Sequence, residues 1–122
     1  MSDLVLIDTG VWIDYLHGHS SVIKLQTLLE DNLACTWIEG ELRAGFIKNR
    51  ESFFNALVKL PYIPTISESI VFKFIETQKL FGQGLSIVDI NLYASAKAEK
   101  VKIWTKDKNL IEICKKSNLY FV

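Results

Sequence analysis

Four acidic residues lie where a folded chain could bring them together. Asp8 directly follows the first apolar run of the chain, and Asp107 follows another apolar segment near its end. Glu41 and Asp89 each lie near the start of an expected helix. Carboxylates that pack side by side repel one another and raise each other's pKa, so a stable cluster usually needs a bound cation. Carboxylate oxygens suit Mg²⁺ or Mn²⁺, which also bridge to phosphate groups.

Two of these acids also fit a purely structural role as helix caps. Ser86 and Asp89 have the three-residue spacing of a capping box, in which each side chain bonds the other residue's backbone N–H. Asp107 is placed to cap the last helix. Asp8 is different, because it follows four apolar residues and has no helix interior to stabilise, which argues against a purely structural role.

Helix geometry decides which of two glutamates after the second expected strand, Glu39 or Glu41, is assigned to the candidate site. Thr36 and Glu39 also have capping-box spacing, which accounts for Glu39. Glu39 and Glu41 are two residues apart, about 200° around a helix of ~3.6 residues per turn, so both cannot point into one site. We therefore assign Glu41 to the candidate site.

The order of the expected elements indicates how the acids would meet. Short strands are expected at residues 4–7, 33–36, 101–105 and 119–122, with an extended segment at 61–66. Helices are expected at 11–16, 21–31, 37–48, 51–60, 67–81, 87–100 and 109–117, with Ile70, Phe74 and Phe81 facing the core from 67–81. Strands alternating with helices favour an α/β fold with a parallel sheet covered on both faces. Ligands bind such sheets at the carboxyl ends of the strands.

Length and composition limit the classes of protein that fit. A chain of 122 residues has room for a single domain, and its 14 basic and 14 acidic residues give zero net charge. Residues 1–41 hold seven acids and one base, whereas residues 97–122 hold seven lysines and three acids. This polarity is compatible with an acidic pocket beside a basic rim, or with ordinary scatter of surface charge. No apolar stretch approaches a membrane span, and two cysteines in apolar sequence indicate a reduced, cytoplasmic protein.

Four sequence blocks, in this order, resemble the PIN domain of VapC-type toxins. The blocks are Leu6–Asp14, Glu41–Gly45, Ser86–Asp89 and Trp104–Asp107, and together with the chain length they extend the resemblance over nearly the whole chain. The resemblance implies a single PIN-like domain over residues 1–122. Its fold would be a three-layer α/β/α arrangement around a mainly parallel sheet of about five short strands.

The same resemblance implies an endoribonuclease that depends on Mg²⁺ or Mn²⁺. Its metal-binding and catalytic acids would be Asp8, Glu41, Asp89 and Asp107. Supporting positions would be Thr9, Thr105 and Asn109. The chain departs from the family at Gly10, where serine is frequent, and at Asn109, where a further aspartate is frequent.

These expectations imply RNA, an antitoxin and a second copy of the chain as binding partners. Lys106, Lys108 and Arg43 are candidates for contacts with the RNA backbone. The family resemblance implies a cognate antitoxin bound in a groove among the early helices, and a homodimer. Aromatic residues beyond what one helix face needs give mild support for such contacts: Phe46, Phe53, Phe54 and Phe72.

Other interpretations of the same residues remain open. A non-catalytic PIN-like module that binds RNA or protein is the main alternative, given Gly10 and Asn109. A phosphatase of the haloacid-dehalogenase type would need an acid where Gly10 stands, and a receiver-type signalling domain would need an aspartate where Thr36 ends the second strand.

Minor signals favour structural roles. The three tryptophans are expected in the core, and His17 and His19 in a solvated turn. Cys35 has no histidine placed to activate it, which argues against thiol catalysis.

Overall fold

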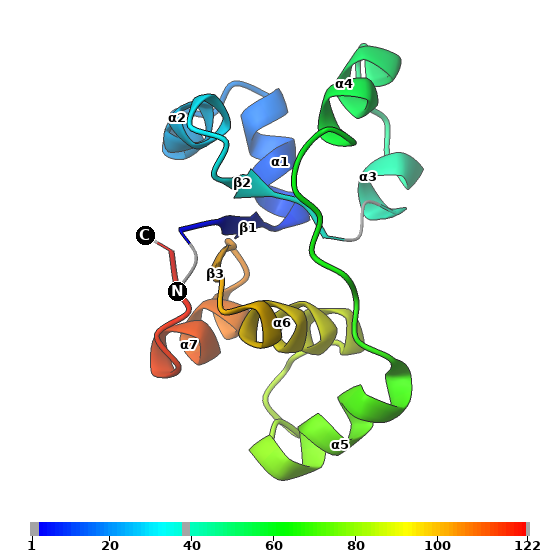
Figure 1. Ribbon diagram of the computed structural model, residues 1–122, viewed down its shortest axis with the longest axis vertical. Coiled ribbons are helices and arrows are strands. Elements are labelled where there is room, and N and C mark those ends of the chain that lie inside the picture. Colours follow the sequence, from blue (N-terminus) through cyan, green and yellow to red (C-terminus); the bar gives the residue numbers. More distant parts are fainter. Residues whose placement is uncertain (1–2, 38–39, 122) are drawn as a thin grey trace.

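A parallel sheet of short strands lies at the centre of the computed structural model (Figure 1). The structure describes residues 3–37 and 40–121, and for residues 40 and 41 it describes the backbone alone. The strands are β1 (Val5–Ile7), β2 (Ala34–Cys35) and β3 (Lys102–Trp104), in the spatial order β2-β1-β3. Both pairings are parallel, so Val5 lies opposite Ala34 on one side and opposite Lys102 on the other.

Single-residue bridges extend the sheet at both outer edges. Thr36 pairs with Tyr62 beside β2, and Ile103 pairs with Tyr120 beside β3, again in parallel. The parallel α/β sheet is thus confirmed, but the strand expected at 119–122 and the extended segment at 61–66 contribute only a single bridge each. At the β2 edge, the N–H of Thr36 donates to the carbonyl of Pro61 at 2.8 Å. Proline has no N–H of its own to continue the ladder.

Helices fill the connections between the strands. They are α1 (Thr9–Leu16), α2 (Lys24–Glu30), α3 (Gly40–Ala44), α4 (Arg50–Leu57), α5 (Glu68–Gln78), α6 (Ile87–Glu99) and α7 (Lys108–Lys116), with a 3₁₀ turn η1 (Ser20–Val22) before α2. These positions confirm the expected helices, with boundary shifts of a few residues, everywhere except over residues 37–48.

The long helix expected over residues 37–48 is wrong, because α3 covers residues 40–44 only. The guanidinium of Arg50 donates to the carbonyl oxygens of Arg43 at 2.6 Å and Gly45 at 3.0 Å. Carbonyls at a helix end need such partners, because no further turn supplies N–H groups to them. Asn49, with φ of 55°, then reverses the chain into α4.

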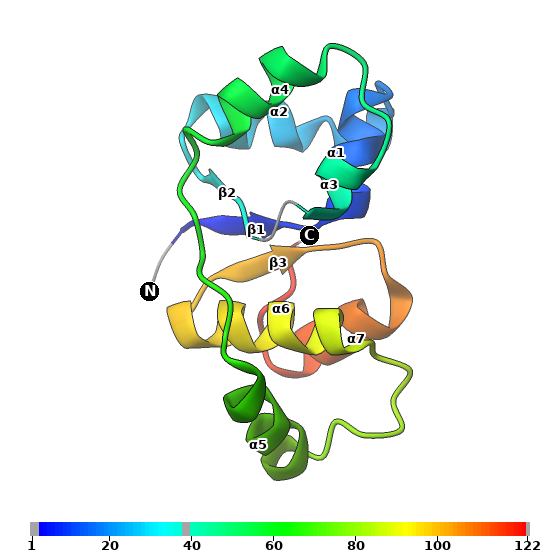
Figure 2. The same cartoon turned by 90° about the vertical axis from the view of Figure 1, so that its right-hand side faces the viewer.

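Different helices cover the two faces of the sheet (Figures 1 and 2). Successive strand residues point to opposite faces. Val5 and Ile7 therefore pack in one core with residues of α1, α2 and α4, whereas Leu6 packs in a second core with residues of α5, α6 and α7. This is the three-layer arrangement expected from the sequence. In the described ranges, none of the helices is long and apolar enough to cross a membrane.

The inward face of α5 differs from the expected one. Ile70 is 57% exposed and Phe81 is 62% exposed, so the expectation that they face the core is wrong. The inward side chains are Val71, Phe74 and Ile75, which follow the spacing of a helical stripe one position further along. Only Phe74 belongs to both sets.

The three tryptophans are buried, as expected. Trp12, Trp37 and Trp104 expose 3%, 6% and 8% of their surface. The indole N–H of Trp37 donates to the hydroxyl of Ser95 at 3.1 Å, which satisfies its one polar atom.

Candidate active site

Asp8 lies at the carboxyl end of β1 and caps α1. One carboxylate oxygen accepts a hydrogen bond from the backbone N–H of Thr9 at 2.8 Å. Its own N–H donates to the carbonyl of Trp104 at 3.0 Å, which ties it to the end of β3. Asp8 therefore has a structural role as well, which the sequence did not predict, because α1 begins at Thr9 and not at Val11.

Thr105 joins the first and last acids of the candidate site. Its hydroxyl donates to the second carboxylate oxygen of Asp8 at 2.7 Å and accepts from the N–H of Asp107 at 3.1 Å. The residue is only 2% exposed, so these partners are what satisfy the buried hydroxyl. Two residues almost a hundred positions apart in the chain are thus held through one side-chain atom.

Asp107 and Asp89 both cap helices, as their places in the sequence predict. A carboxylate oxygen of Asp107 accepts from the N–H of Leu110 at 2.9 Å, at the start of α7. Asp89 forms the capping box of α6, in which Ser86 Oγ accepts from Asp89 N–H at 3.1 Å and Asp89 accepts from Ser86 N–H at 3.2 Å. A carboxylate has about four lone-pair sites, so capping leaves acceptor positions for another ligand.

The helices that carry the acids begin at one edge of the sheet. In Figure 2 the starts of α1, α3, α6 and α7 all lie at the side toward which β1 and β3 run. Helix N-termini carry partial positive charge, which stabilises nearby carboxylates. The topology thus brings Asp8 and Asp107 together at the carboxyl edge of the sheet, and α6, which carries Asp89 in its first turn, begins at the same edge.

Glu41 belongs to α3, whose backbone lies at this edge, but its side chain is outside the described residues, and so is Glu39. Among the side chains that the structure does describe, no three acids, histidines or cysteines are close enough to hold a metal ion. Asp8 and Asp107, linked through Thr105, present hard oxygen donors of the kind that Mg²⁺ and Mn²⁺ bind. The donor chemistry fits such an ion.

The remaining candidate residues surround these acids. Thr9 is half-buried at the first position of α1, and Gly10 is exposed beside it. A Cβ placed on Gly10 meets nothing within 4 Å, so a serine would fit there. Asn109 lies in the first turn of α7 and donates from its amide to the carbonyl of Gly84 at 3.2 Å.

The basic candidates have distinct surroundings. Lys106 forms an ion pair with Asp14 of α1 and a hydrogen bond with Ser21 Oγ at 3.2 Å. Lys108 is exposed at the first position of α7. The guanidinium of Arg43 lies over the ring of Phe54, with 4.2 Å from its central carbon to the ring centroid. The pairing of Asp14 with Lys106 was not predicted from the sequence, because no local pattern pairs residues so far apart.

Burial makes both cysteines unsuited to nucleophilic catalysis, which agrees with the expectation for Cys35. Burial raises the pKa of Cys35 to about 12. Burial, together with the negative charge of Asp8, raises the pKa of Cys114 to about 12. Both thiols therefore stay protonated at neutral pH, and a thiol is a poor nucleophile. His17 and His19 are exposed, in agreement with the solvated turn expected for them.

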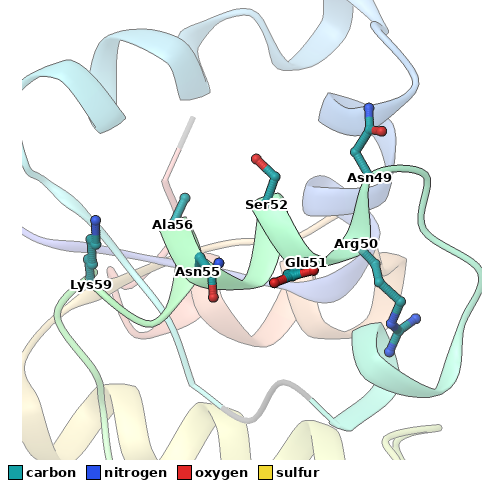
Figure 3. A pocket seen from close by; sticks show the side chains of 7 residues that line it. All are labelled: Asn49, Arg50, Glu51, Ser52, Asn55, Ala56 and Lys59. Atoms are coloured by element: carbon teal, nitrogen blue, oxygen red, sulfur yellow. The ribbon is translucent and has the colours of Figure 1, made fainter.

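Two surface hollows lie away from these acids. A groove of about 760 Å³ between α1, α3 and α4 is lined by apolar residues that include Ile13, Leu16 and Phe46. A second hollow of about 800 Å³ runs along α4 between Asn49 and Lys59, and Figure 3 shows Arg50 directed from it toward α3. Among the described side chains, neither hollow is lined by Asp8, Asp89 or Asp107.

Comparison with known proteins agrees with this geometry. Residues 5–116 match the PIN domain family. Two curated relatives, both named Ribonuclease VapC32 and from two strains of Mycobacterium tuberculosis (CDC 1551 / Oshkosh and ATCC 25618 / H37Rv), are each 31% identical to this chain over 118 residues. Each alignment covers 95% of this chain and 94% of the relative. With its acids at the carboxyl edge of a parallel sheet and this similarity over nearly its full length, the chain belongs to the PIN domain family as a VapC-type member.

Proposed function

We propose that this protein is a toxin of a toxin–antitoxin pair, an endoribonuclease that hydrolyses RNA phosphodiester bonds with Mg²⁺ or Mn²⁺. One observation carries the proposal: the Thr105 hydroxyl holds Asp8 and Asp107 together at the carboxyl edge of the sheet. The curated relatives, which are named ribonucleases, support RNA as the substrate class. The protein would act in the cytoplasm, where its RNA substrates and reduced cysteines belong.

The acids would act in metal binding and in proton transfer. Asp8, Glu41, Asp89 and Asp107 would hold the ion, which when bound polarises the phosphodiester and lowers the pKa of a water molecule. Thr105 fixes the orientation of the Asp8 carboxylate and the backbone of Asp107. A carboxylate at this edge would accept the proton of the attacking water.

Cations beside the acids would hold the RNA backbone. Lys108 is exposed one residue from Asp107, and Arg43 lies on the same short helix as Glu41. Positive side chains next to the site would neutralise phosphates, so binding would weaken as salt is raised. Lys106 forms an ion pair with Asp14 instead.

Cleavage of purified RNA with Mn²⁺ tests the enzymatic proposal. Asp8→Asn should abolish cleavage while the fold persists, because asparagine is as good an N-cap as aspartate and retains the acceptor for Thr9. Asp31→Asn, at an exposed position after α2, is the matched control and should cleave normally. Full activity of the Asp8→Asn variant would refute the assignment, and mapped cut ends would identify the preferred RNA.

A non-catalytic PIN-like module is the alternative. It is favoured by Asn109 in place of an acid and by the absence of a three-acid cluster among the described side chains. Such a module would bind RNA or protein without any Mn²⁺-dependent cleavage.

The apolar groove between α1, α3 and α4 is our proposed site for the antitoxin. Phe46, at its rim, is 96% exposed, and Ile13 and Leu16 of α1 are more than one-third exposed. Exposed apolar patches of this kind mark protein contacts. Phe46→Ala should weaken capture of the co-expressed cognate antitoxin at least tenfold without changing RNA cleavage, whereas unchanged capture would place the antitoxin elsewhere.

A homodimer is the proposed form of the free protein. Ile87 and Val88, in the first turn of α6 beside Asp89, are 47% and 42% exposed, which supports a contact next to the site. Light scattering during gel filtration should give twice the chain mass, and Val88→Lys should reduce it. A monomer at all concentrations would contradict this proposal.

A further inference from the structure

An ion pair beside the candidate site joins two distant parts of the chain. Lys106 Nζ contacts Asp14 Oδ2 and also lies 3.2 Å from Ser21 Oγ. Asp14 belongs to α1, Ser21 to η1, and Lys106 to the segment between β3 and α7. The Asp14–Lys106 pair therefore holds the loop after β3 against the helix after β1.

The position of Lys106 in the chain links this pair to the acids. It lies directly between Thr105, which bonds Asp8, and Asp107, which caps α7. Asp14 in turn lies on the helix that Asp8 caps. Two side-chain contacts therefore link α1 and its cap to the loop after β3. One is the hydrogen bond of buried Thr105 with Asp8, and the other is the exposed ion pair of Lys106 with Asp14.

The charges around Asp14 also favour its ion pair with Lys106. The Lys106 ammonium, by its hydrogen bond and its charge, holds the pKa of Asp14 below its ordinary value, and the charges of His19 and His17 act in the same direction. His19 Nε2 lies 4.0 Å from Asp14 Oδ1. Asp14 thus remains charged at neutral pH, and the ammonium of Lys106, although exposed, pairs with its carboxylate.

We propose that Lys106 is a positioning residue whose ion pair with Asp14 fixes the Thr105–Asp107 segment, rather than a contact for the RNA backbone. This inference rests on the proposed ribonuclease function. A lysine that is neutralised by Asp14 contributes little attraction to phosphate. Loss of either partner would instead loosen the segment that carries Asp107.

The two roles predict opposite effects for Asp14→Asn, which makes the experiment decisive. A phosphate-binding Lys106 would be released by this substitution, so the KM for RNA would fall. A positioning Lys106 would lose its partner, so kcat would fall roughly 3- to 10-fold at unchanged KM, because small misplacements of a reacting group slow the chemical step. Lys106→Met, which keeps most of the side-chain stem, should do the same.

A double variant and a conservative replacement further distinguish the positioning role of Lys106 from phosphate binding. Asp14→Asn combined with Lys106→Met should be no slower than either single variant, since both remove one interaction. Lys106→Arg should retain most of the activity. Lys59→Met, at an exposed position after α4, is the control for loss of a lysine and should leave kcat unchanged. The salt dependence of KM should be the same for wild type and Lys106→Met.

Hydrogen exchange gives a readout that does not require activity. The N–H groups of Asp107 and Leu110 are bonded to Thr105 and Asp107, so both should exchange faster in Asp14→Asn and Lys106→Met than in wild type. A lower KM for Asp14→Asn, or a higher KM and a weaker salt dependence for Lys106→Met, would overturn the proposal. Unchanged exchange and kcat in both variants would also overturn it. If wild type cleaves no RNA, the proposed function fails, and exchange alone still decides the positioning role.

Discussion

The Thr105 hydroxyl is the residue-scale feature on which the candidate site depends. It is buried, donates to Asp8 at 2.7 Å and accepts from Asp107 N–H at 3.1 Å. Thr105→Val keeps the shape but removes both bonds, so a carboxylate oxygen and a backbone N–H lose their partner. We expect a loss of about 1–3 kcal/mol in the free energy of unfolding, measured by urea denaturation.

The conservative replacement separates the hydroxyl from the shape of the side chain. Thr105→Ser restores the hydroxyl and should recover most of the RNA cleavage that Thr105→Val loses. Equal cleavage by wild type and Thr105→Val would mean that orientation of Asp8 does not depend on this bond.

The sequence predicted the local roles of some acids and not of others. Asp89 and Asp107 act as caps, which the spacing from Ser86 and the start of α7 already indicated. The capping role of Asp8 was not predicted, because Thr9 and Gly10 give no helical signal and α1 begins there through the Asp8 cap itself. The partnership of Lys106 with Asp14 depends on tertiary contact, which no local pattern encodes.

At the scale of elements, the prediction succeeded where an apolar pattern is continuous. β1 is apolar throughout and buried on both faces, and α6 carries a capping box at its start. The helix over 37–48 failed because its end is set by a side chain from the next helix, Arg50. The inward face of α5 failed because neighbouring apolar residues, Ile70 and Val71, gave two possible stripes.

In the loop between α5 and α6, the backbone of Gly84 lies close to the side chain of Asn109 in α7. Gly84 has φ of 74°, and a Cβ there would lie 2.7 Å from Asn109 Nδ2. Gly82 has φ of 72° with nothing within 4 Å, which makes it a matched control. Each alanine substitution should cost about 1–2 kcal/mol for the left-handed backbone.

Gly84→Ala should cost more than Gly82→Ala, because it also displaces the Asn109 amide from the carbonyl that it bonds. Urea denaturation of both variants measures the difference. Equal losses would show that the contact with Asn109 adds nothing to the cost of the backbone conformation.

At the scale of the molecule, the parallel topology brings residues that are far apart in the sequence close together in space. β1 lies between β2 and β3, so the segments after β1 and β3 leave the sheet side by side and carry Asp8 and Asp107 to one edge. The zero net charge conceals a polarity, with the surplus acid in the first third and the surplus lysine in the last quarter. Sequence order predicted that Asp8 and Asp107 would meet at this edge, whereas the exact contacts depend on how the two cores pack.

Metal binding is the molecule-scale property that separates the enzyme from the binding module. An ion that binds only the folded state at one hundred times its Kd would stabilise it by about 2.7 kcal/mol. We therefore expect Mn²⁺ to raise the melting temperature of wild type, and Asp8→Asn and Asp107→Asn to reduce that rise, since each removes a charged ligand while asparagine retains the cap. Asp31→Asn should behave like wild type. A melting temperature that Mn²⁺ leaves unchanged in wild type would favour the non-catalytic module, because a carboxylate site that binds no ion cannot supply the proposed chemistry.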